Sequence, residues 1–138
     1  MAQVAIRAGG LTFGARFEDV LAPRTCATFR TLLPFRRQLV QARWSGEAAW
    51  VPLGDLRLDL PSENATAEPG PGQLLFYPRG VSETEILFPY GITRFASKFG
   101  ALKGNHFLTI TEGATLLAEL GQLVLWKGAQ PIVIEAAP

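Results

Sequence analysis

Lys103-Gly-Asn-His-Phe-Leu-Thr-Ile-Thr-Glu-Gly113 carries the clearest structural signal in the chain. It begins with a turn at Gly104-Asn105, alternates apolar with threonine side chains, and ends at a second glycine. This pattern is typical of a β-strand held between two turns. His106 is the only histidine, so the one side chain that ordinarily titrates near neutral pH lies at the start of this strand. We therefore predict a central strand with a candidate catalytic residue at its start. The alternative is a structural role, which is more common for a lone histidine beside apolar residues.

Short strands and tight turns are also predicted on both sides of this segment. Residues 3–8 and 11–18 flank Gly9-Gly10, and the alternation of the second segment indicates a hairpin with one buried face. The longest predicted loop runs from 61 to 72, where no apolar residue recurs periodically. Further strands are predicted at 38–44, 48–53, 56–60, 74–77, 86–90, 92–97 and 131–135.

Two short helices complete the expected fold. Pro23 suits the first turn of a helix that runs to Leu33 and is stopped by Pro34, and a second helix is predicted at 114–120, with 122–126 ambiguous. Many short strands with few helices favour an all-β fold, because closing the sheet into a barrel removes its exposed edges. We predict a closed β-barrel with the first helix across one opening. The residues expected to share its core are Phe13, Phe17, Phe29, Leu108 and Ile110.

Composition limits the setting and the partners. The 138 residues suit a single domain, 1–138. A formal net charge of +1 with scattered basic residues argues against nucleic acid or a membrane surface as partner. With Cys26 as the only cysteine, neither an intramolecular disulfide nor a Cys/His zinc cluster is expected. We expect a cytoplasmic protein with no metal and no cofactor, and no apolar run approaches the ~20 residues of a membrane-spanning helix.

Several short motifs resemble those of cyclophilins. Ala27 to Leu32 is similar to the Glu-Asn-Phe-Arg-Ala-Leu helix of that family, and Leu102 to Phe107, continuing to Glu112-Gly113, is similar to its Leu-Asp-Gly-Lys-His-Val and Glu-Gly segments. In the middle of the chain, Ala42 to Glu47 resembles the Arg-Trp-Gly-Glu segment of small bacterial cyclophilin-like proteins, and Pro71 to Pro78 resembles their Gly-Asp-Leu-Ala-Tyr-Trp-Pro strand. The resemblance covers most of the chain and implies a cyclophilin-like barrel.

The same resemblance implies an activity and its limits. Arg43 falls where cyclophilin isomerases carry the arginine that hydrogen-bonds the amide region of proline, and His106 falls at a pocket histidine. The Gln-Gly-Gly segment after that arginine is absent, and Ala101 stands where the pocket tryptophan belongs. Prolyl isomerase activity is therefore expected to be weak or absent. Cyclophilin-like barrels also occur in enzymes that open cyclic amides and ureas, such as allophanate hydrolase and oxoprolinase, which suggests an amide or imide ligand.

The candidate site gathers polar and aromatic residues near predicted strand ends. We expect Arg43 and His106 to share a cavity as a catalytic pair, because a guanidinium fork beside a neutral imidazole can hold a carbonyl or carboxylate while a proton moves. The alternative is a solvated rim for the polar residues and a core wall for the aromatic ones. The candidate ligand-binding residues are Trp44, Glu47, Phe88, Tyr90 and Arg94.

Two function classes follow from these observations. The first is a protein that binds or acts on a small polar metabolite (an amide, imide or carboxylate) in a pocket at the barrel mouth. The alternative is a peptidyl-prolyl isomerase or peptide-binding chaperone. Catalysis is left open, with a cyclic amide or imide hydrolase, or an accessory to one, ahead of an isomerase. Assembly into a homo-oligomer is also left open.

Overall fold

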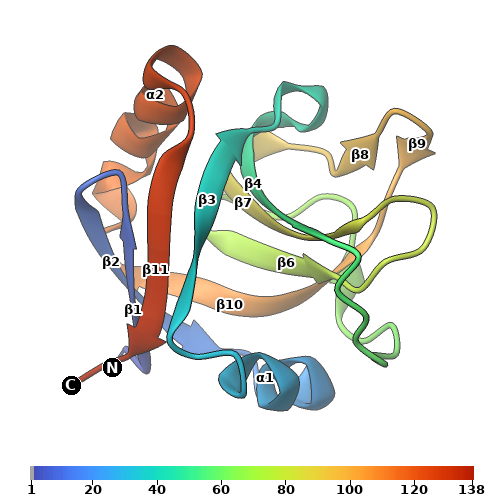
Figure 1. Cartoon of the computed structure of the whole chain (residues 1–138). Coiled ribbons are helices and arrows are strands. Elements are labelled where there is room, and N and C mark those ends of the chain that lie inside the picture. The colour runs from blue at the N-terminus through green and yellow to red at the C-terminus, as the bar shows by residue number, and fades with distance from the viewer. Residues whose placement is uncertain (1) are drawn as a thin grey trace.

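The computed structural model describes residues 2–138 and shows a closed antiparallel β-barrel (Figure 1). Its eight strands follow one another in the order β2-β1-β11-β3-β4-β7-β6-β10, and β10 pairs with β2 to close the circle. This confirms the predicted fold class. The barrel strands are β1 (Val4–Ala8), β2 (Leu11–Phe17), β3 (Phe35–Gln41), β4 (Gly46–Gly54), β6 (Gln73–Tyr77), β7 (Thr84–Thr93), β10 (Gly104–Glu112) and β11 (Gln130–Ala136).

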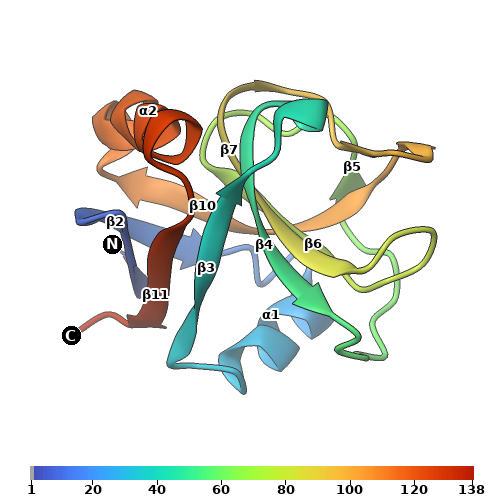
Figure 2. The same cartoon turned by 45° about the horizontal axis from the view of Figure 1, so that its top comes forward.

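The helices lie at opposite ends of the barrel (Figures 1 and 2). Helix α1 (Pro23–Arg30) places Phe29 inside one end, and α2 (Leu117–Lys127) adds Leu120 and Val124 to the same core at the other. Two 3-10 turns, η1 (Arg43–Ser45) and η2 (Ala114–Leu116), connect β3 to β4 and β10 to α2. Both openings of the barrel are therefore occupied by apolar side chains.

The predicted core is confirmed. Phe13, Phe17, Phe29, Leu108 and Ile110 all belong to one buried cluster inside the barrel. Phe29 is at its centre, and its ring centroid lies 5.0 Å from that of Phe107 and 5.2 Å from that of Phe35. Such edge-on and tilted packing is favourable for aromatic rings beyond the area they bury. The hairpin, α1 and the central strand are held together by this contact set.

A second, smaller cluster lies on the outside of the barrel wall. Because side chains alternate along a strand, Leu75 of β6 and Leu87 of β7 point away from the first core. They are covered by Phe95 and Leu102, which flank a separate two-stranded hairpin, β8 (Ala96–Ser97) with β9 (Gly100–Ala101). Figure 1 shows this hairpin outside the barrel, on the side where η1 lies. Strand β7 is consequently buried on both faces from Thr84 to Pro89.

The predicted strand at 56–60 is wrong. The chain runs from 55 to 64 with no strand, and only β5 (Ala65–Thr66) forms a short pairing with β10 in the predicted 61–72 loop. Leu58 and Leu60 pack, partly buried, against the barrel core. Their alternation reflects an extended segment lying over the core, without a neighbouring strand to complete a ladder.

Other boundaries shift by a few residues. Helix α1 ends at Arg30, and a turn continues as Leu32 and Leu33 donate to the carbonyls of Phe29 and Arg30. The strand predicted at 38–44 begins at Phe35 and ends at Gln41, so Arg43 lies in a 3-10 turn. The ambiguous 122–126 segment is helical, because α2 continues to Lys127.

Candidate functional site

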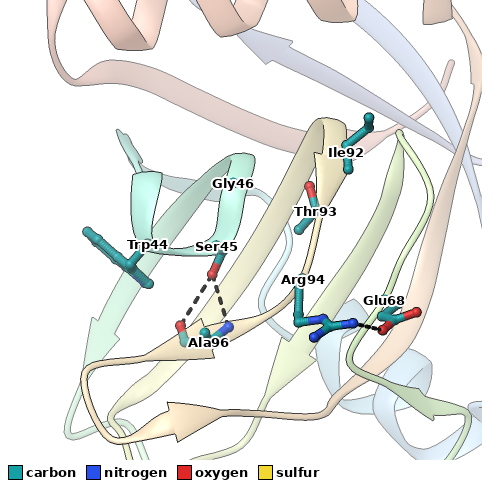
Figure 3. A pocket seen from close by; sticks show the side chains of 8 residues that line it. All are labelled: Trp44, Ser45, Gly46, Glu68, Ile92, Thr93, Arg94 and Ala96. Carbon is teal, nitrogen blue, oxygen red and sulfur yellow. Dashed lines mark hydrogen bonds and ion pairs between the residues drawn. The ribbon is translucent and has the colours of Figure 1, made fainter.

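The η1 turn is held in one place by backbone and side-chain contacts. Ser45 Oγ accepts the N–H of Ala96 at 3.1 Å and lies 3.2 Å from the Ala96 carbonyl, to which it donates (Figure 3). Gly46 follows with φ of 94°, and a Cβ there would come within 2.7 Å of the Ile92 carbonyl oxygen. Only glycine suits this position. The turn therefore presents Trp44 outward, with 52% of its surface exposed.

Trp44 lines two adjoining recesses. The first has a volume of about 470 Å³, and across it Arg94 forms an ion pair with Glu68 at 2.7 Å (Figure 3). Both of these side chains are largely exposed, so water and salt screen their attraction. The first recess is lined by Trp44, Ser45, Gly46, Glu68, Ile92, Thr93, Arg94 and Ala96.

The second recess, of about 350 Å³, lies between the outer wall of the barrel and the β8–β9 hairpin. Strand β4 contributes Trp50, whose ring lies 5.6 Å from that of Trp44 at an interplanar angle of 77°. Strand β7 contributes Glu85, and its side chain belongs to the face of β7 opposite the barrel interior. The second recess is lined by Trp44, Trp50, Ser82, Glu85, Ser97 and Lys98.

Two polar atoms of residues that line the second recess are buried beneath its surface without a hydrogen-bond partner. They are Oε2 of Glu85, a residue only 3% exposed, and Nε1 of Trp50. Buried polar atoms almost always have a partner in native proteins, so these two atoms are exceptions among the described residues. Burial raises the pKa of Glu85 to about 8, and the nearby Glu83 carboxylate adds to the rise. At neutral pH the Glu85 carboxyl therefore carries its proton.

The predicted catalytic pair lies on two different elements, Arg43 on η1 and His106 on β10. Arg43 is exposed on η1, and the expectation that it projects from a strand is wrong. His106 is half-buried on β10, where its Nε2 lies 2.8 Å from Thr109 Oγ1, which in turn donates to Glu18 at 2.5 Å. Burial lowers the pKa of His106. Neither Arg43 nor His106 lines either of the two Trp44 recesses.

The predicted ligand-binding residues divide in the same way. Trp44 and Arg94 line the recesses. Phe88 is fully buried in the barrel core, 6.0 Å from the ring of Phe13. Glu47 accepts the N–H of Ile92 at 2.8 Å, and the Tyr90 hydroxyl donates to Gln41 at 3.0 Å.

Trp50 and Glu85 line the second recess but are not among the site residues predicted from the sequence, and the two recesses lie away from the predicted barrel mouth. The expected barrel mouth is filled by α1 and α2, whereas the two recesses open on the outside of the wall. One signal was available: Glu85 opens the apolar run Ile86-Leu87-Phe88, and a strand that is apolar at successive positions is covered on both faces. An acidic residue at the start of such a strand is therefore expected to be buried beneath the segment that covers the outer face of the sheet.

Within 2–138 there is no group of three or more His, Cys, Asp or Glu side chains placed to hold a metal ion. In that range no helix combines the length and the apolar character needed to cross a bilayer.

Comparison with known proteins gives the family. The family described as "Protein of unknown function (DUF3830)" matches residues 4–135. The chain belongs to the DUF3830 family. No curated protein matches it.

Two solved structures share the barrel of this DUF3830 protein. The structure of McbB in complex with tryptophan has a TM-score of 0.73 at 16% identity, covering 96% of this chain and 44% of McbB. This chain thus spans less than half the length of McbB. The solution structure of the hypothetical protein AF2241 from Archaeoglobus fulgidus has a TM-score of 0.55 at 14% identity, covering 99% of this chain and 95% of that one. At these identities the likeness shows the fold alone.

Proposed function

We propose that this DUF3830 protein binds a small polar metabolite carrying an amide, imide or carboxylate group in the second recess. The observation that carries the proposal is the pair of buried, unpartnered polar atoms on Trp50 and Glu85, set in a recess walled by two indole rings. Small-molecule sites combine apolar walls with a few placed polar groups in this way. A planar ligand would stack on one indole ring, meet the other nearly edge-on, and offer partners to both polar atoms.

An amide or imide meets the two groups best. Its carbonyl accepts the Trp50 indole N–H, and its own N–H donates to the carbonyl oxygen of the Glu85 carboxyl, so the Glu85 O–H can still donate to the same ligand carbonyl. A carboxylate offers acceptors only and needs Glu85 to keep its proton. An ammonium group would pair with Glu85 but leave the Trp50 N–H unsatisfied, which costs about 1–3 kcal/mol.

The proposal also includes cations at the rim of the recesses and a proton carrier. The exposed Arg43 shares its turn with Trp44, and Arg94 lines the first recess, so both belong to the proposal as rim cations that attract an anionic ligand. His106 is kept as a proton carrier for any catalysis. A cyclophilin-like ancestry and a bacterial, cytoplasmic setting are also part of this proposal, supported by the barrel and by the single buried Cys26. McbB, which shares the fold, is in complex with tryptophan.

The indole N–H signals of the three tryptophans provide a direct test. Each signal is assigned by a tryptophan-to-phenylalanine variant, and the protein is titrated with succinimide, 2-pyrrolidinone and acetate. We expect the Trp50 signal to move most and the Trp44 signal to move with it. Trp126 serves as internal control, because it lies on α2 and donates to Gln122. Equal movement of all three signals, or none, would contradict the proposal.

The alternative function, a prolyl isomerase or peptide-binding chaperone, is favoured by one observation. Exposed apolar side chains border the recesses on this side of the barrel. Ile92 lines the first recess, and Trp44 lines both the first and the second. Val81 and Phe99 line a third recess that adjoins the second. We expect weak or absent isomerisation of a proline peptide, because the resemblance puts Ala101 at the position of the pocket tryptophan. Robust isomerisation that is lost on Arg43→Ala would favour the alternative.

A further inference from the structure

The chemistry of the second recess depends on which form of Glu85 faces the ligand. The residue is 3% exposed, its Oε2 has no hydrogen bond, and its side chain has no ion pair within residues 2–138. An isolated carboxylate in such a place would lose its hydration without compensation. A protonated carboxyl avoids that loss and turns one oxygen into a donor.

We propose that Glu85 binds the ligand as a neutral carboxylic acid, so that its O–H and the Trp50 indole N–H both donate to a carbonyl or carboxylate oxygen. The inference rests on the proposed function and specifies it. The site then selects acceptor groups and rejects organic cations, although two indole walls beside an acid would otherwise suit a cation. A neutral carboxylic acid acting as donor in an apolar site is a known device for binding a developing or full negative charge.

The charged groups around Glu85 agree with this assignment. Glu83 lies two residues before Glu85 in the chain, and its negative charge disfavours a second charge on Glu85. The hairpin places Lys98 at the edge of the same recess, where it favours an anionic ligand. Asp55, which follows β4, lines the adjoining recess with Glu83 and Lys98. On β6 the register partner of Glu85 is Tyr77, whose hydroxyl accepts the N–H of Val81 at 2.9 Å.

A matched series of three ligands can show whether Glu85 is protonated or ionised when it binds. Benzoate, benzamide and benzyltrimethylammonium share one ring that can stack on a single indole. They differ in presenting acceptors only, a donor with an acceptor, or a permanent cation. Affinity is measured by calorimetry between about pH 6 and pH 9.5, where the Glu85 carboxyl changes form. We expect benzoate and benzamide to bind at the lower pH and the cation to bind most weakly. The pKa of Glu85 is about 8, so above this pH the protonated form becomes scarce. The affinity for benzoate should then fall about tenfold per pH unit.

Three variants separate the contributions. Glu85→Gln keeps the shape and a donor but cannot ionise, so it should bind benzoate at pH 6 and remove the loss of affinity above pH 8. Trp50→Phe keeps an aromatic wall and removes the N–H donor, so affinity for benzoate and benzamide should fall about fivefold to tenfold. Lys98→Gln is the electrostatic control: it should weaken benzoate at every pH and leave the pH dependence of the remaining affinity unchanged.

The outcomes are distinguishable. Tighter binding of benzyltrimethylammonium than of benzoate, strengthening as the pH rises through 8, would show that Glu85 acts as an anion and would overturn the inference. Benzoate or benzamide binding with no pH dependence, unchanged in Glu85→Gln, would overturn it as well while leaving the proposed function standing. Failure of benzoate, benzamide and the metabolite-like probes to bind would overturn both.

Discussion

Replacing Glu85 by glutamine should change how the stability of the protein depends on pH. The folded state holds the Glu85 proton with a pKa of about 8, against an ordinary value of 4.5. The folded state therefore binds more protons than the unfolded state between these values. Stability from this group is complete below pH 4.5 and is lost as the pH rises through 8. At ~1.4 kcal/mol for each pH unit, the difference amounts to about 5 kcal/mol, and relaxation around the carboxylate brings the expected loss to about 3–5 kcal/mol.

Urea unfolding at about pH 5.5, 7 and 8.5 measures this loss. Across that range the free energy of unfolding of the parent should fall by about 1 kcal/mol per pH unit more than that of Glu85→Gln, and the variant should be the more stable protein at the highest pH. Glu119→Gln, at an exposed position on α2, removes the same charge and should keep the pH dependence of the parent. If the free energy of unfolding depended on pH equally in Glu85→Gln and the parent, the buried carboxyl would be ionised in the folded state. Glu85 could then not act as a hydrogen-bond donor.

Three further predictions follow from buried groups elsewhere. Phe29→Ala should lower the free energy of unfolding by about 3–5 kcal/mol, because it empties the centre of the core, whereas Phe99→Ala at an exposed position should change it by less than about 0.5 kcal/mol in the same denaturation assay. The Cys26 thiol, whose pKa burial raises to about 12, should react with an alkylating reagent only as fast as the protein unfolds, and rapid labelling of the native state would contradict its burial. Burial lowers the pKa of His106 below 6.5, so stability should fall as the pH drops from 6.5 through the folded value, and His106→Gln should flatten that fall; an imidazole titration by NMR at or above 6.5 would refute it.

The barrel could be predicted because its signals are local. Strand alternation around Gly9-Gly10 indicates a hairpin, both glycines have positive φ, and the central strand forms from Gly104 to Glu112 close to the predicted bounds. The errors also have local causes. The alternating leucines of 56–60 fit a strand, but an alternating pattern cannot show whether a neighbouring strand is present.

The candidate site forms only when separate segments of the chain come together, so only part of it could be predicted from the sequence. Trp44 was identified from the sequence, and its η1 turn is held against the hairpin by Ser45. Trp50 and Glu85 were missed because each lies in an ordinary strand pattern, and the recess between them exists only once the hairpin carrying Lys98 folds over the outer wall.

Sequence by itself determined the closed barrel and its phenylalanine core, since periodicity and turn residues act on their immediate neighbours. Only the tertiary structure decided that Glu85 is buried, that burial raises the pKa of its carboxyl, and that Arg43 and His106 do not share a Trp44 recess. The physical reason is that burial and pKa are set by surroundings. Those surroundings come from η1, β4, β7 and the hairpin, segments that are separated along the chain and meet only in the folded protein.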